Sequence, residues 1–116
     1  MSTLANKNVK SLVLQCSELF NVKSFVETGT LYGETTRWAA KTFEYVHTIE
    51  LSEKLYQDAL EKHKKFKNIH HYLGNSLDTL PRIVNTLDNS TLFWLDAHWS
   101  GGVTAKSEVE CPLIAE

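Results

Sequence analysis

The sequence predicts an α/β domain in which helices cover both faces of a parallel sheet. Short β-prone segments alternate strictly with helical segments along the 116 residues, and this order requires crossover connections between parallel strands. The last β-prone segment, residues 91–96, is apolar nearly throughout, as buried parallel strands are. A polar or acidic residue directly follows the apolar part of each strand segment. These observations together indicate a ligand site at one edge of the sheet.

The predicted strands are short runs of apolar, β-branched and aromatic residues bounded by turn-forming residues. They span residues 24–27, 45–50, 69–73 and 91–96. The expected strand order is 3-2-1-4, with helices on both sides. This is a three-layer, Rossmann-like parallel sheet.

The predicted helices follow apolar residues that recur at helical spacing. They span residues 9–20, 34–43, 52–66 and 77–87, and a further helix is expected from about residue 107. Ser52 is a favourable N-cap, and Glu53 suits the first turn of the same helix. Ser76 is the expected N-cap of the next helix. Pro81 weakens that helix, so its regular part is expected to start near Asp78.

The overall charge argues against a polyanionic partner. Twelve Lys and Arg residues against 14 Asp and Glu residues give a formal net charge of −2, so no strong field attracts nucleic acid or an anionic membrane. The lysines between residues 62 and 67 lie beside acidic residues and are interpreted as a solvated helix face. No run approaches the ~18 apolar residues of a membrane span, and no signal peptide is recognised. We therefore expect a cytoplasmic protein with neither a membrane nor a nucleic-acid partner.

The turns after the strands carry the candidate chemistry, because ligands of doubly wound sheets bind beyond the carboxyl ends of the strands. Those turns are residues 27–33, 50–51, 74–76 and 96–102. In the first turn, Gly29 and Gly33 allow the backbone to approach a ligand closely. The following helix directs its free N–H groups at the same place, where a carboxylate or phosphate is favoured. A tight strand-to-helix turn without a ligand is the alternative.

Glu50 stands at the tip of the second strand segment. A carboxylate there can accept hydrogen bonds from both hydroxyls of a ribose, while an exposed surface glutamate is the alternative. Leu31 occupies the place where a dinucleotide-binding turn has its middle glycine, and the phosphate-loop pattern GxxxxGK[ST] is absent. The pattern therefore disfavours NAD, FAD, ATP and GTP and favours an adenosyl ligand.

The segment from Val26 to Thr36, with the sequence VETGTLYGETT, resembles the first motif of class I S-adenosylmethionine-dependent methyltransferases. It is most similar to the variant E-x-G-T-x-x-G-x-[ST] of small-molecule O-methyltransferases, such as the macrocin and cephalosporin-hydroxylase-like groups. Glu50, the turn at residues 74–76 and Asp96 match later motifs of that family. The resemblance spans about residues 24–102.

The resemblance implies S-adenosylmethionine as the cofactor and methyl transfer to a small-molecule acceptor, at oxygen. It places Gly29 and Thr30 near the methionine part of the cofactor and Glu27 close to its ammonium. It assigns the ribose to Glu50, and the adenine to Asn75 and Ser76, although Asn75 is an amide where the family often has a carboxylate. The expected cofactor-binding residues are Glu27, Gly29, Thr30, Tyr32, Gly33, Thr35, Glu50, Leu51, Asn75, Ser76 and Asp96.

The loop at residues 96–102 has three interpretations. Asp96 and His98 could bind a divalent metal such as magnesium, with Asp96 as the expected ligand. His98 could be a general base that deprotonates the acceptor, which makes His98 and Asp96 the candidate catalytic residues. Asp96 could instead have a structural role, capping backbone amides of the Gly101-Gly102 turn.

The expected domain covers residues 1–116 and is short for this family, whose sheet normally has seven strands. We therefore expect one cofactor-binding domain that is cut short at its C-terminus; the alternatives are a minimal binding domain and a homodimer that covers the edge of the fourth strand. Two other functions stay open. One is a non-catalytic nucleoside- or S-adenosylmethionine-binding module, and the other is a metal-dependent hydrolase built on Asp96 and His98.

Overall fold

A parallel sheet forms the middle layer of the computed structural model, which describes residues 7–95 and 114–115. Its strands are β1 (Ser24–Thr28), β2 (Tyr45–Glu50), β3 (Ile69–Leu73), β4 (Thr91–Leu95) and β5 (Ile114–Ala115). The sheet order is β3-β2-β1-β4-β5, and β1 to β4 pair in parallel. The predicted order 3-2-1-4 of a Rossmann-like sheet is therefore confirmed.

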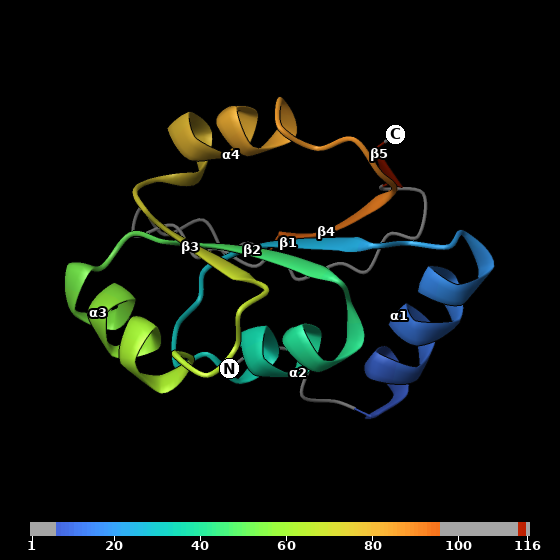
Figure 1. Cartoon of the computed structure of the whole chain (residues 1–116), viewed down its shortest axis with the longest axis horizontal. Coiled ribbons are helices and arrows are strands. Elements are labelled where there is room, and N and C mark those ends of the chain that lie inside the picture. The colour runs from blue at the N-terminus through green and yellow to red at the C-terminus, as the bar shows by residue number, and fades with distance from the viewer. Residues whose placement is uncertain (1–6, 96–113, 116) are drawn as a thin grey trace.

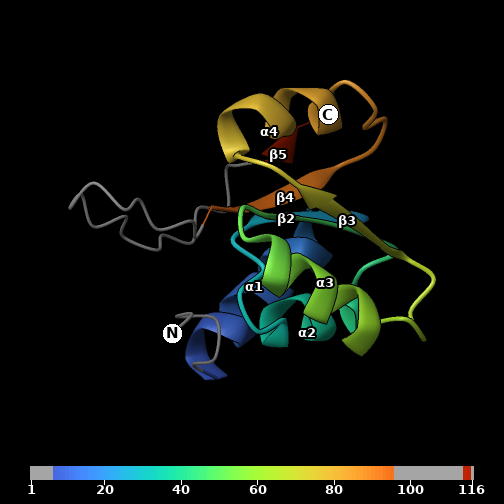
Figure 2. The same cartoon turned by 90° about the vertical axis from the view of Figure 1, so that its left-hand side faces the viewer.

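Helices cover both faces of this sheet, as Figures 1 and 2 show. They are α1 (Lys7–Leu19), α2 (Glu34–Thr42), α3 (Glu53–Lys62) and α4 (Ser76–Val84). The first three lie on one face and α4 lies on the other. Each of the three helices that follow β1, β2 and β3 begins just beyond the carboxyl end of its strand, so these helix N-termini gather at one edge of the sheet.

The boundaries of two helices, α3 and α4, differ from the predictions. Helix α3 ends at Lys62 rather than near residue 66, because His63 leaves helical geometry (φ −106°, ψ 16°) and its side chain is buried. Helix α4 starts at Ser76 with Asn75 as its N-cap, so the predicted capping by Ser76 is wrong by one residue. It ends at Val84, and the chain continues in turns to Leu87.

The C-terminal end of the chain also differs from the prediction. A helix was expected from about residue 107 onwards, but Ile114 and Ala115 form β5, which pairs antiparallel with β4. The partners are Leu92 and Thr91, at the edge of β4 where a homodimer was one expectation. Residues 96–113 lie outside the described part of the chain.

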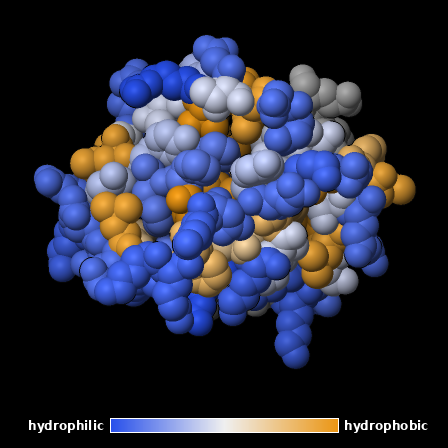
Figure 3. Space-filling view, viewed as in Figure 1, coloured by the Kyte–Doolittle hydropathy of each residue, from blue (hydrophilic) through white to orange (hydrophobic). Residues whose placement is uncertain are grey.

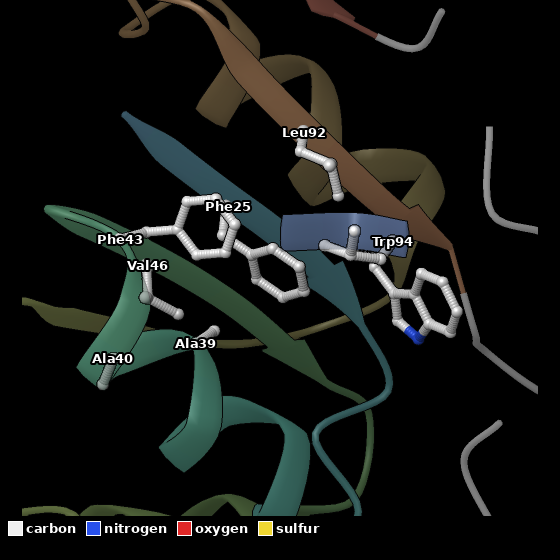
Figure 4. Packing of buried hydrophobic residues seen from close by; sticks show 8 residues of the cluster. Phe25, Ala39, Ala40, Phe43, Val46, Leu92 and Trp94 are labelled. Atoms are coloured by element: carbon white, nitrogen blue, oxygen red, sulfur yellow. The ribbon is translucent and has the colours of Figure 1, made fainter. Parts of the chain in front are cut away.

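The larger hydrophobic core lies between the sheet and the α1–α2 layer. Its buried members are Val13, Phe25, Ala39, Ala40, Phe43, Val46, Leu92 and Trp94. The rings of Phe25 and Phe43 stack with centroids 5.1 Å apart, and Trp94 lies at one end of the group in Figure 4. A smaller core, built on Val26, Ile49 and Ile83, fixes α4 to the opposite face. The two cores pack helices against both faces of the strands, beneath the turns at their carboxyl ends.

Hydrophilic side chains cover most of the face shown in Figure 3. Within residues 7–95 and 114–115, no helix combines the length and the apolar character needed to cross a membrane.

Candidate functional site

The carboxyl edge of the sheet brings together the turns that follow β1, β2 and β3. The end of β2 joins the other two by backbone hydrogen bonds. The amides of Gly29 and Thr30 donate to the Ile49 carbonyl at 2.8 and 3.2 Å, and the Gly74 amide donates to the Glu50 carbonyl at 3.0 Å. Three of the four turns that the sequence singled out are therefore connected to one another.

The turn after β1 has an unusual backbone. Gly29 (φ +85°) and Gly33 (φ +83°) adopt positive φ, which glycine tolerates best. Leu31 also has a positive φ of 51°, which is uncommon for a residue with a side chain. Its amide donates to Glu50 Oε1 at 2.8 Å. The carboxylate of Glu50 thus stabilises the strained residue in the middle of the turn.

Glu50 is only 6% exposed, and both of its carboxylate oxygens accept hydrogen bonds from the backbone. Oε1 accepts from Leu31, and Oε2 accepts from the Ser52 amide at 2.9 Å. The alternative of an exposed surface glutamate is therefore wrong. Because each carboxylate oxygen has a second lone pair, this arrangement leaves acceptor capacity for a ligand hydroxyl.

Glu27 lies beneath the turn, not on its open side. It is 1% exposed, and its Oε1 accepts hydrogen bonds from the hydroxyls of Thr36 and Thr48, the latter at 2.9 Å. The Thr30 hydroxyl lies 2.5 Å from that of Thr48. Since Thr48 donates to Glu27, Thr30 donates to Thr48. A chain of hydroxyl groups thus connects the turn to a buried carboxylate.

The turn after β3 is shaped by the start of α4. The side chain of Asn75 accepts from the Asp78 amide at 2.8 Å and donates to the Asp78 carboxylate at 2.9 Å. Gly74 is held close to α4, because a Cβ at this position would lie 2.9 Å from the Thr79 hydroxyl. Asn75, which the sequence predicts to contact adenine, is therefore the N-cap of α4. Ser76, the other predicted adenine contact, is the first residue of the helix.

Large apolar side chains stand exposed along this edge. Tyr32, Leu51 and Leu77 are each 70–72% exposed, although they follow three different strands. Two of them, Tyr32 and Leu51, were expected to bind the cofactor. Thr35, a third expected residue, is half-buried in the first turn of α2.

The candidate catalytic and metal-binding residues Asp96 and His98 lie outside the described residues. Within residues 7–95 and 114–115, no three His, Cys, Asp or Glu side chains come close enough together to hold a metal ion.

Comparison with known proteins identifies the fold. No protein-family model and no curated protein sequence matches the chain. Among solved structures, an O-methyltransferase from Bacillus cereus in complex with S-adenosylhomocysteine is similar over 80% of this chain and 46% of its own, with 23% identity and a TM-score of 0.64. An rRNA methylase from Streptococcus thermophilus is similar over 81% of this chain and 74% of its own, with 11% identity and a TM-score of 0.52.

The chain has the class I methyltransferase fold. It spans less than half the length of the Bacillus cereus O-methyltransferase. The sequence resemblance of the first turn to methyltransferases is therefore accompanied by a similar arrangement of the strands and helices of this chain.

Sequence reasoning missed three contributors to this site. The role of Asp78 could have been predicted, because Asn75-x-x-Asp78 has the spacing of a capping box. The role of the Leu31 amide could not, since it depends on a left-handed backbone conformation that leucine does not favour. His63 approaches Gly33 from another element, α3, and no local pattern indicates this contact.

Proposed function

We propose that this chain binds S-adenosylmethionine at the carboxyl edge of its sheet and transfers the methyl group to a small-molecule acceptor, at oxygen. The observation that carries the proposal is the buried Glu50 carboxylate, which joins the glycine turn after β1 to the turn after β2. In the proposed complex it accepts hydrogen bonds from the ribose hydroxyls through its remaining lone pairs.

The described residues fit the rest of the cofactor. Helix α2 begins after Gly33, which offers no side-chain cap, so the first amides of the helix suit the carboxylate of the methionine part. Gly29 and Thr30 form the wall beside that part. The Oε1 of the buried Glu27 already accepts hydrogen bonds from two threonines. Its negative charge therefore attracts the positively charged ammonium from beneath the turn.

The exposed apolar side chains at the edge fit the adenine ring. Leu51 follows β2 and Leu77 follows β3, and both are well exposed. Covering them with an aromatic ring removes apolar surface from water, which stabilises the complex by about 25 cal/mol for each Å². Asn75 and Ser76 then contact the polar edge of the base.

The reaction needs little chemistry from the protein. The sulfonium group of S-adenosylmethionine supplies an already activated methyl group when bound. The turns orient the cofactor, and such positioning supplies much of the rate in group transfer. We propose His98 as the base that takes the proton of the acceptor hydroxyl, and Asp96 as the second catalytic residue.

The acceptor is the least constrained part of the proposal, because the same fold occurs in a protein named as an rRNA methylase. The formal net charge of −2 favours a small molecule over RNA. We also propose a cytoplasmic location.

Calorimetric titration with S-adenosylhomocysteine tests the role of Glu50. Glu50→Ala should raise the Kd at least tenfold, about 1.4 kcal/mol. Glu50→Gln should have an intermediate effect, since an amide can bond a hydroxyl but has one acceptor oxygen instead of two. Glu44→Ala, which removes an exposed glutamate paired with Lys23, is the matched control. Equal affinity of Glu50→Ala and the wild-type protein would exclude the proposed ribose contact.

A further inference from the structure

A buried histidine at the C-terminal end of α3 lies against the glycine turn. His63 is 3% exposed and follows the last residue of the helix. Its ring occupies the space beside Gly33, where an added Cβ would lie 2.5 Å from His63 Cε1 and 2.9 Å from Nε2. Gly33 therefore needs to be glycine for two reasons, its positive φ and the histidine ring next to it.

A hydrogen bond with the Gly33 backbone raises the pKa of the His63 ring, although burial, the larger cause, lowers it. The ring nitrogen that lies closest to an added Cβ on Gly33 is Nε2. His63 Nδ1 has no hydrogen-bond partner among the described residues.

The preceding residue contacts the same turn. Lys62 Nζ donates to the Tyr32 carbonyl at 3.0 Å. The end of α3 thus contacts two consecutive residues of the turn, Tyr32 through Lys62 and Gly33 through His63. These contacts add to the hydrogen bonds that the turn makes with the end of β2.

We infer that His63 is a positioning residue, which fixes the distance between α3 and the turn that holds the proposed cofactor. The ring is itself held by neighbours. It stacks on His71 of β3 with centroids 5.7 Å apart and meets Phe66 edge-on at 6.2 Å. A ring packed between two aromatic neighbours and against Gly33 allows the turn little freedom.

The surroundings favour the neutral form of this ring. Burial is the main cause that lowers the pKa of His63, and the positive charges of Lys62 and Arg37 lower it further. The pKa of its neighbour His71 is lowered to about 4. A neutral ring packs beneath the turn without adding another positive charge there.

This inference rests on the proposed function for its consequence in ligand binding, so two readouts are used. The first is hydrogen exchange of the Gly33 and Arg37 amides in the free protein, which donate to the carbonyls of Thr30 and Gly33. His63→Leu should speed their exchange at least tenfold, while His63→Gln, which keeps a side-chain N–H group able to bond the Gly33 backbone, should restore much of the protection. His70→Leu, at an exposed histidine of β3, is the control.

The second readout is the affinity for S-adenosylhomocysteine. Gly33→Ala should weaken binding strongly, because its Cβ meets the ring. The double variant Gly33→Ala/His63→Ala should bind more tightly than the product of the two single effects predicts, since the smaller residue removes the clash. Circular dichroism at each step confirms that the variants are folded.

The outcomes separate the two claims. Unchanged exchange at Gly33 and Arg37 in a folded His63→Leu variant would overturn the inference, and so would equal protection in the Leu and Gln variants. If exchange is faster in His63→Leu but the wild-type protein does not bind S-adenosylhomocysteine, the positioning of the turn is supported and the proposed function is overturned.

Discussion

Glu27 and Glu50 carry identical side chains, yet they have different roles in the structure. Glu27 is enclosed by threonine hydroxyls beneath the first turn, whereas Glu50 binds backbone amides between two turns. A buried carboxylate is costly unless hydrogen bonds compensate for its lost hydration. Glu27 therefore depends on hydroxyl donors from α2 and β2, whereas Glu50 depends on amide donors from the turns.

Thr48 offers a direct test of this dependence. Thr48→Val keeps the shape of the side chain but removes the donor to Glu27, so we expect a loss of about 1.5–3 kcal/mol in the free energy of unfolding, as for hydrogen bonds to charged groups. Chemical denaturation measures it. Thr42→Val is the control, because Thr42 donates only to the carbonyl of Trp38 in its own helix, and its effect should stay within about 0.5 kcal/mol. Equal effects in the two variants would show that Glu27 does not need the Thr48 hydroxyl.

At the scale of residues, the sequence indicated which positions matter more readily than what they do. Gly29, Gly33 and Glu50 were singled out because turn glycines and an acidic strand end are local patterns. The positive φ of Leu31 and the contact between His63 and Gly33 arise only when separate elements pack together. No local pattern could have indicated them.

At the scale of elements, the strands were predicted more accurately than the helix ends. All four parallel strands were located within one residue, because buried strands are apolar runs between turn residues. The start of α4 was harder, since Asn75 and Ser76 are both favourable N-caps and only the backbone geometry selects between them. Helix α3 ends early because His63 turns into the interior.

The cap of α4 gives the prediction for this scale. Asn75→Ala removes the acceptor of the Asp78 amide and should lower the free energy of unfolding by about 1 kcal/mol. Asn75→Ser retains an N-cap acceptor and should lose less than half as much. Thermal and urea unfolding of the three proteins makes the comparison. If the Ala and Ser variants were equally stable, capping would not be the role of this side chain.

At the scale of the whole molecule, the topology followed from the alternation of strands and helices, because crossover connections force parallel pairing. The two-residue strand β5 could not be predicted, since so short a segment has no pattern of its own. The exposed apolar residues at one edge also become one surface only when three separate strands are placed side by side.

The buried histidines give the whole molecule a pH dependence. Burial and a neighbouring histidine lower the pKa of His47 and of His71 to about 4, from 6.5. Between these values the unfolded chain binds protons that the folded chain does not, so stability is complete above pH 6.5 and falls as the pH decreases towards 4. The slope is at most about 1.4 kcal/mol per pH unit for each residue, and solvent screening makes the share of the half-buried His71 smaller.

Thermal unfolding at pH 7, 5.5 and 4.5 measures this slope. A His47→Phe/His71→Phe variant should show a flatter dependence, because neither position can then bind a proton. The same slope in the variant and the wild-type protein would assign the acid sensitivity to other groups.

Calorimetric titration of the wild-type chain with S-adenosylhomocysteine, NAD and ATP tests the central claim most directly. The turn after β1 has Leu31 in place of a middle glycine, and Glu50 suits a ribose. We therefore predict saturable one-site binding of S-adenosylhomocysteine in the micromolar range and no binding of NAD or ATP. Binding of NAD or ATP without binding of S-adenosylhomocysteine would contradict the assignment of this edge to an adenosyl-methionine ligand.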